Sequence, residues 1–172
     1  MNPRRPLFFV CLLLLIAGLD GCCGQQICDC FSEEEDRILL RFDLDSLHQG
    51  FRRAETRGTY VVRFAQPGFG QPIDTVRENA GQSGLNFYSY GIALNYLFKP
   101  LGSVNGPVGY SYAIVLPALQ RRYQLTDLEL AGEMRGDRCC QCYRNTHKRL
   151  RLDGVYIVAD GAGHREVAVL RR

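Results

Sequence analysis

Cysteines are the residues of this chain best suited to chemistry, and they form two clusters far apart in the sequence. The six that follow residue 22 are Cys23, Cys28, Cys30, Cys139, Cys140 and Cys142. In an oxidising compartment, two such clusters form disulfides between an early and a late segment. We expect at least one bond from Cys28 or Cys30 to the second cluster, and closing a loop of about 110 residues removes about 4–5 kcal/mol from the unfolded state. The exact connectivity stays open.

The same thiols offer a second chemistry, the tetrahedral binding of zinc. Side chains two apart in a strand share a face, so Cys28 with Cys30 and Cys140 with Cys142 could supply four thiolates. A Cys-x-Cys spacing lacks the turn of a Cys-x-x-Cys zinc knuckle, and export favours oxidation. We therefore expect disulfides, with no metal and no cofactor.

Residues typical of catalysis are sparse. The three histidines, His48, His147 and His164, are isolated from one another. His147 follows the second cysteine cluster and could complete a Cys/His site, but we expect an exposed turn histidine. Gly161 and Gly163 lack the helix and the third glycine of a phosphate loop, and no hydrolase motif is present. We expect no enzymatic activity.

Tyrosines form a local repeat in the middle of the chain. Residues 88–94 and 110–116 share a Tyr-Ser-Tyr start followed by apolar residues. If the two segments pair as antiparallel strands about residue 100, they bring together Tyr88, Tyr90, Tyr110 and Tyr112. An exposed cluster of this kind would be a stacking platform for sugar rings. The tyrosines share strand parity with the apolar residues that follow them, so we expect all four to be mostly buried.

The charge of the chain argues against a nucleic-acid partner. The formal net charge is +3, and it falls to +2 after residue 21, because Arg4, Arg5 and Asp20 precede that point. The remaining arginines are spread in pairs with acidic residues between them, whereas a nucleic-acid surface gathers them.

The N-terminus indicates where these residues work. Arg4 and Arg5 precede an apolar run from Leu7 to Leu19, which is shorter than the roughly 20 residues of a comfortable membrane span. The pattern predicts a secretory signal peptide over residues 1–21. An uncleaved membrane span is the remaining alternative.

Leu19-Asp20-Gly21-Cys22 resembles the lipobox of bacterial lipoproteins, with an aliphatic residue three before the cysteine and a small residue just before it. Asp20 stands where the family usually has a small uncharged residue. The resemblance implies lipid, such as palmitate, on Cys22. Cys23 replaces the aspartate of an inner-membrane retention signal, which implies an outer-membrane location in the cell envelope. An ordinary cleavable signal would instead give a periplasmic or secreted soluble protein.

The rest of the sequence is typical of strands and turns. Residues 38–45 alternate with Ile38, Leu40, Phe42 and Leu44 inward, and residues 59–64 alternate with Tyr60, Val62 and Phe64 inward. We expect a short edge strand at 73–78, a last strand at 166–170, and at most one short helix between residues 43 and 57. Asp153-Gly154 predicts a type I′ hairpin between residues 150–152 and 155–157.

These elements predict an all-β domain, an antiparallel β-sandwich of about seven to nine strands, immunoglobulin-like or transthyretin-like. We expect a signal peptide at 1–21, a tether and cysteine-rich segment at 22–37, and the sandwich at 38–172. The layout resembles small β-sandwich lipoproteins of Gram-negative envelopes. It implies a non-catalytic structural or interaction module, attached to the membrane by its lipid, with an envelope protein or polysaccharide as partner. A carbohydrate- or small-ligand-binding protein is the alternative, and an enzyme is the third.

Overall fold

The computed structural model describes residues 28, 30, 35–66, 68–79, 86–98, 107–137, 139–160 and 168–172. Nine strands are present in this part of the chain: β1 (Leu39–Phe42), β2 (Tyr60–Ala65), β3 (Pro72–Arg77), β4 (Ile92–Ala93), β5 (Tyr110–Leu116), β6 (Arg121–Asp137), β7 (Cys140–Leu152), β8 (Val155–Val158) and β9 (Ala168–Leu170). The helical turns are η1 (Ser46–His48), α3 (Arg53–Thr56), α4 (Phe87–Tyr90), α5 (Leu94–Leu97) and η2 (Pro117–Leu119). The chain is therefore mostly β, as predicted.

The strands form two sheets that share one core. The six-stranded sheet has the order β3-β2-β5-β6-β7-β8 and is antiparallel throughout, while the three-stranded sheet has the order β4-β1-β9 with β1 and β9 parallel. Leu40 and Phe42 of the small sheet belong to the same buried cluster as Ile114 and Leu125 of the large one. The core thus lies between the sheets.

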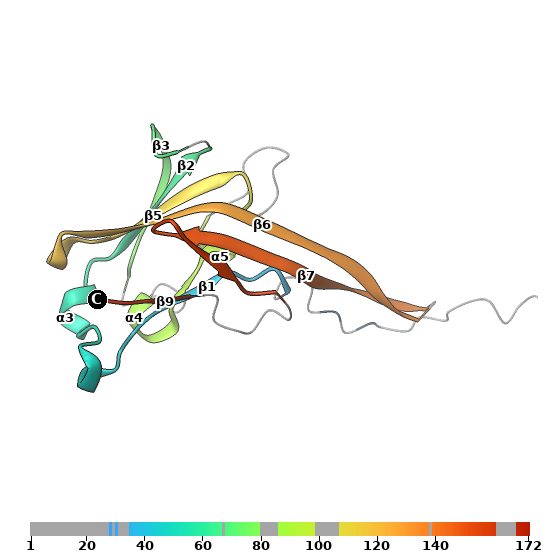
Figure 1. Cartoon of the computed structure of the whole chain (residues 1–172), viewed down its shortest axis with the longest axis horizontal. Helices are drawn as coiled ribbons and strands as arrows, with labels where there is room; N and C mark the ends of the chain where they lie inside the picture. The colour runs from blue at the N-terminus through green and yellow to red at the C-terminus, as the bar shows by residue number, and fades with distance from the viewer. Residues whose placement is uncertain are drawn as a thin grey trace, which may run out of the picture.

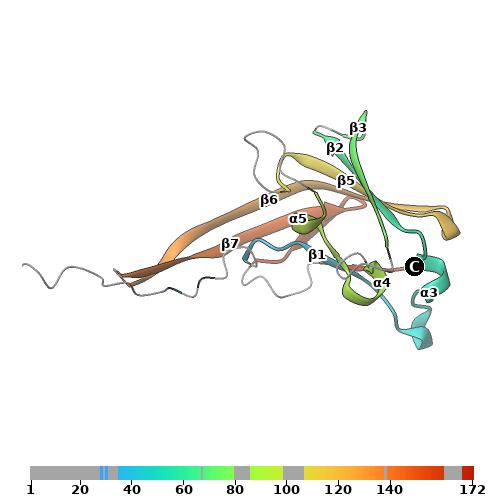
Figure 2. The ribbon, with the colours of Figure 1, turned by 180° about the vertical axis from the view of Figure 1, so that it is seen from behind.

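Two strands of the large sheet extend far beyond the core. β6 and β7 pair from Leu125 opposite Leu152 out to Asp137 opposite Cys140, and Figures 1 and 2 show them running out of the body as a twisted two-stranded arm. At its tip, Asp137 Oδ1 accepts hydrogen bonds from the backbone N–H groups of Cys139 at 3.0 Å and Cys140 at 2.8 Å. We call this hairpin, from Ala131 to Asn145, the arm.

The terminal hairpin forms as predicted. Asp153 and Gly154 have φ values of 50° and 80°, which a type I′ turn requires, and they join β7 to β8 with Leu152 opposite Val155. The edge strand β3 and the last strand β9 also lie where the sequence indicated. At most one short helix was expected between residues 43 and 57, but two helical turns form there, η1 and α3. Asp45 caps the first of them by accepting from the Leu47 N–H at 2.9 Å.

The inward face predicted for residues 59–64 is wrong. Val61, not Val62, belongs to the main core, and Arg63 on the same face is only 2% exposed. Tyr60, Val62 and Phe64 form a second, smaller cluster on the opposite face. The alternation could not reveal this, because the Arg63 guanidinium is accommodated between the rings of Phe98 and Tyr110, 4.9 Å from each centroid.

The predicted pairing of the two tyrosine segments is also wrong. Residues 87–90 form the helical turn α4, which Asn86 caps by accepting from Ser89 N–H at 3.1 Å, and Gly91 with φ 79° ends it. β4 then pairs with β1, and β5 lies between β2 and β6. Tyr110 and Tyr112 are buried as expected, whereas Tyr88 is half-buried and Tyr90 is 59% exposed.

Candidate functional site

Two disulfides fasten the start of the described chain to the tip of the arm. Cys28 is bonded to Cys140 and Cys30 to Cys142, with Cα–Cα distances of 5.5 and 5.3 Å. Both pairs are 112 residues apart, so Cys28 and Cys30 follow each other in the same direction as Cys140 and Cys142 of β7. Cys139 is disulfide-bonded as well. The predicted link between the two cysteine clusters is confirmed.

The four cysteines considered as zinc ligands, Cys28, Cys30, Cys140 and Cys142, are all in disulfide bonds. In the described residues, no group of three or more His, Cys, Asp or Glu side chains lies close enough together to hold a metal ion. The predicted lipidation site Cys22, the disulfide candidate Cys23 and His164 lie outside the described residues.

A polar cluster next to the disulfides joins Glu35 and Asp36 to residues 143–145 of β7. The buried Glu35 carboxylate accepts from Arg144 Nη1 at 2.7 Å and from Asn145 N–H at 3.1 Å. Asp36 Oδ1 accepts from Tyr143 OH at 3.0 Å and from Asn145 Nδ2 at 2.7 Å. We call the disulfides and this cluster together the clasp. No pattern in the sequence indicated this cluster, because its partners lie more than a hundred residues apart.

Burial and neighbouring charges shift the pKa values of three side chains in or beside the clasp. Burial raises the pKa of Glu35, but hydrogen bonds from Arg144 and the Asn145 backbone, with the positive charges of Arg144 and Lys148, outweigh it and lower that pKa overall. Burial, then the hydrogen bond and charge of Asp36, raises the pKa of Tyr143 to about 12. Burial lowers the pKa of Lys148, although Asp36 and Glu35 oppose that shift. At neutral pH the carboxylate of Glu35 is therefore ionised and bound.

The described histidines pair with acids. His48 Nδ1 lies 2.6 Å from Asp45 Oδ2, and His147 Nε2 lies 2.8 Å from Glu129 Oε2. His147 was expected in an exposed turn, but it belongs to β7 and its side chain is 29% exposed. That expectation is wrong, because the β6–β7 ladder continues through this position, with His147 opposite Ala131.

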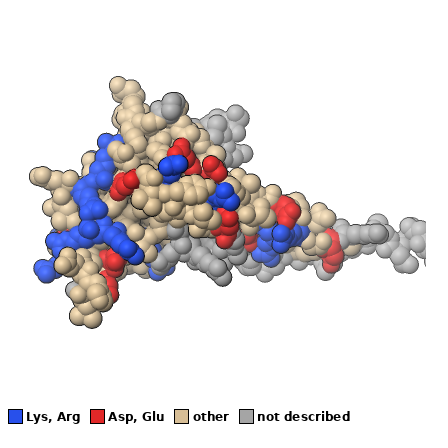
Figure 3. All heavy atoms as spheres, in the orientation of Figure 1, with Lys and Arg blue, Asp and Glu red and all other residues tan. Residues whose placement is uncertain are grey.

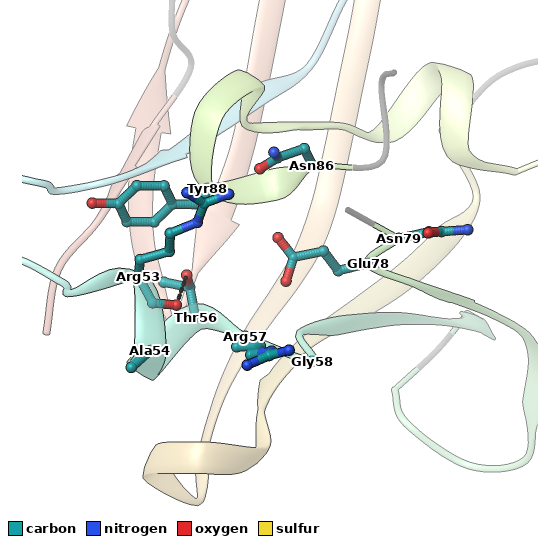
Figure 4. A pocket seen from close by; sticks show the side chains of 9 residues that line it. All are labelled: Arg53, Ala54, Thr56, Arg57, Gly58, Glu78, Asn79, Asn86 and Tyr88. Carbon is teal, nitrogen blue, oxygen red and sulfur yellow. Dashed lines mark hydrogen bonds between the residues drawn. The ribbon is translucent and has the colours of Figure 1, made fainter. Parts of the chain in front are cut away.

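An open pocket of about 650 Å³ lies on the body, between α3, the end of β3 and the start of α4. Figure 4 shows Arg53 and Tyr88 on one side, Asn86 and Glu78 facing the opening, and Arg57 beneath. The remaining lining residues are Ala54, Thr56, Gly58 and Asn79. Of the four tyrosines proposed as a ligand platform, Tyr88 is the one that lines this pocket.

Arginines gather at the end of the body opposite the arm tip (Figure 3). Contacts bring six of them together. Arg172 pairs with Glu55 of α3, which packs against the turn η2 that precedes β6, and the sheet register aligns β3 with the start of β6. The six are Arg53, Arg57, Arg77, Arg121, Arg122 and Arg172. We call this surface the basic end. Arg77 and Arg122 lie in one cross-strand row through Tyr60 and Val115. The sequence showed only scattered arginine pairs, because the sheet register and α3 bring them together.

Aromatic rings support two of these arginines. The Arg77 guanidinium lies 4.7 Å from the centroid of Tyr60, and that of Arg122 lies 4.9 Å from the centroid of Phe69 and 5.5 Å from that of Phe64. Stacking on a ring holds a guanidinium by its face and leaves its N–H edges for other partners.

Comparison with known proteins found no family model, no curated protein and no solved structure that matches this chain. Within the part of the chain described, no helix is long and apolar enough to cross a membrane.

Proposed function

We propose that this protein is a non-catalytic lipoprotein of the cell envelope, held in the outer membrane by lipid on Cys22, that acts as an interaction module. The observation that carries the proposal is the clasp, because it joins the segment just after the proposed anchor to one end of an elongated molecule. Cys28 follows Cys22 by six residues, and six residues span at most about 20 Å. The arm tip is therefore held close to the membrane.

The arm then sets the distance between the membrane and the basic end. β6 contains 17 residues and runs from the basic end to the arm tip, and at about 3.3 Å per residue a strand of that length covers roughly 50 Å. A partner in the envelope, either a protein or a polysaccharide, would meet the basic end rather than the arm. The clasp keeps this arrangement under load, because two covalent bonds resist separation of the first segment from β7.

Two measurements test the anchor and the orientation. Intact-mass analysis and membrane fractionation compare the wild type with Cys22→Ala, and we expect lipid on the wild type only. In liposomes carrying the lipidated protein, a dye attached through an unnatural amino acid at Met134 on the arm is compared with one at Ala118 in η2. Quenching by nitroxide lipids should be strong at position 134 and weak at position 118.

Two outcomes would overturn the proposal. Equal mature masses apart from the substitution, with both forms soluble, would favour a periplasmic or secreted protein with an ordinary signal. Equal quenching at both positions would mean that the molecule lies along the membrane.

We also propose that the two sheets form a β-sandwich. A single core between a three-stranded and a six-stranded sheet supports a β-sandwich of the immunoglobulin-like or transthyretin-like kind. An experimental structure with the two sheets packed face to face would bear this out, and sheets that diverge away from a common core would contradict it.

Binding of a carbohydrate or small ligand is the second candidate function. The pocket beside Tyr88 favours it, because a concave site with an aromatic wall and a few charged groups is the usual form of a small-molecule site.

A further inference from the structure

Three charged side chains that line the pocket have no ion-pair partner within the described part of the chain. They are Arg53, Arg57 and Glu78. Two other charges on these elements are paired: Glu55 of α3 binds Arg172 at 2.8 Å, and Arg63 of β2 lies 3.4 Å from Asp74 of β3. The three charges that face the pocket can therefore pair with a ligand.

The placement of these groups is complementary to a ring that carries an acidic group. Arg53 is the first residue of α3 and Arg57 is the residue that follows it, and both line the pocket. Guanidinium groups bind carboxylate and phosphate through paired N–H donors. The basic end adds a positive field that attracts anions to this side of the molecule.

The other walls suit the rest of a sugar. The half-buried Tyr88 offers an aromatic ring to the apolar face of a pyranose. Asn86 uses its Oδ1 to cap α4, which leaves its Nδ2 as a donor. Glu78, half-buried and facing the opening (Figure 4), can accept from sugar hydroxyls.

From these contacts we infer that the pocket binds an acidic saccharide. Arg53 and Arg57 hold the carboxylate or phosphate, Tyr88 stacks on the ring, and Glu78 accepts from a hydroxyl group. The inference deepens the proposed function and rests on it for the location of the ligand, since acidic polysaccharides are components of cell surfaces.

The test is a calorimetric titration of the purified protein with its disulfides intact. The probes are tetragalacturonate, the neutral maltotetraose, glucose 6-phosphate and inorganic phosphate. We expect saturable binding of one or both acidic sugars, at least about ten-fold tighter than that of maltotetraose. Tetragalacturonate and glucose 6-phosphate distinguish a carboxylate from a phosphate as the recognised group.

Matched variants locate the site. Arg53→Gln/Arg57→Gln and Tyr88→Ala should each weaken binding about ten-fold or more, and Tyr88→Phe should restore it. Arg121→Gln/Arg122→Gln removes the same charge from the basic end outside the pocket and should change affinity by no more than about two-fold. Thermal unfolding of every variant confirms that it is folded.

Several results would overturn the inference. They are no binding of either acidic sugar, equal binding of maltotetraose, competition by inorganic phosphate at the same concentration, or equal losses in the two double-arginine variants. Each titration is independent of the lipid on Cys22, so failure here is distinguishable from failure of the proposed anchor.

Discussion

Cys30 and Cys142 are 112 residues apart in the chain, yet their Cα atoms lie 5.3 Å apart. Cys28 and Cys140, at the same separation, form a second bond beside them. Once one of these bonds closes the long loop, the other closes only a few additional residues. The two bonds therefore contribute unequally, depending on which is removed first.

Removing one disulfide should thus cost much less than reducing them all. For Cys30→Ser/Cys142→Ser we expect a loss of about 2 kcal/mol. Full reduction of that variant, which breaks both the Cys28–Cys140 bond and the disulfide of Cys139, should cost at least about 5 kcal/mol more, because only then is the long loop opened. Urea unfolding with and without reductant measures both values. A single-pair variant that is already as unstable as the reduced wild type would contradict this account.

Acid should weaken the clasp through Glu35. Its pKa is lower in the folded protein than the ordinary value of 4.5, so its stabilisation is complete above that value and is lost as the pH falls through the folded-state pKa. In Glu35→Gln the free energy of unfolding should be lower at neutral pH and should fall less steeply below about pH 5.

Urea unfolding across this pH range measures the Glu35 effect. The control is Glu133→Gln, because Glu133 forms an exposed pair with Arg135 on the arm, and exposed pairs contribute little. Its unfolding free energy should follow the wild-type pH dependence. Parallel curves for wild type and Glu35→Gln would show that the bound carboxylate does not govern acid stability.

Tyr112 and Tyr90 should respond very differently to truncation, although the sequence repeat makes them look alike. Tyr112 is 1% exposed and donates to Pro107 O at 3.2 Å, whereas Tyr90 is 59% exposed. We expect Tyr112→Ala to cost about 3–5 kcal/mol and Tyr90→Ala to stay within about 0.5 kcal/mol. Chemical denaturation measures both losses of unfolding free energy. Similar losses at the two positions would contradict the structure and support the predicted cluster of four buried tyrosines.

A methyl group at Gly132 should distort the arm. A Cβ there would meet the Arg144 carbonyl and the Tyr143 ring across the hairpin, and overpacking of this kind costs about 1–3 kcal/mol. Gly70→Ala is the control, because nothing lies within 4 Å of the position of its Cβ. Hydrogen exchange of the arm amides should accelerate in Gly132→Ala and stay unchanged in Gly70→Ala. Equal protection in both variants would mean that the arm tolerates the extra group.

The sequence by itself determined the features of the fold that depend on residues close together in the chain. Asp153-Gly154 specifies its turn because the required positive φ values are a local property. The alternation identified the buried face of Ile38, Leu40 and Phe42, which the structure confirms. It was wrong for Leu44, which follows the end of β1 and is 42% exposed. Two cysteine clusters behind an expected signal peptide were sufficient to predict a link between an early and a late segment, and two disulfides form that link.

Only the tertiary structure decided which distant residues meet. The arm was not predicted, because register shifts between Thr126 and Glu129 and between Ala131 and Gly132 interrupt the alternation that marks a strand. The identity of the cysteine pairs depends on the register of residues 28–30 against β7. The pocket draws its lining from three segments, and the basic end forms only when the sheet and α3 bring the end of β3 and the start of β6 to the same end of the body. Strand partners are chosen by packing across the whole domain, and no short stretch of sequence contains that information.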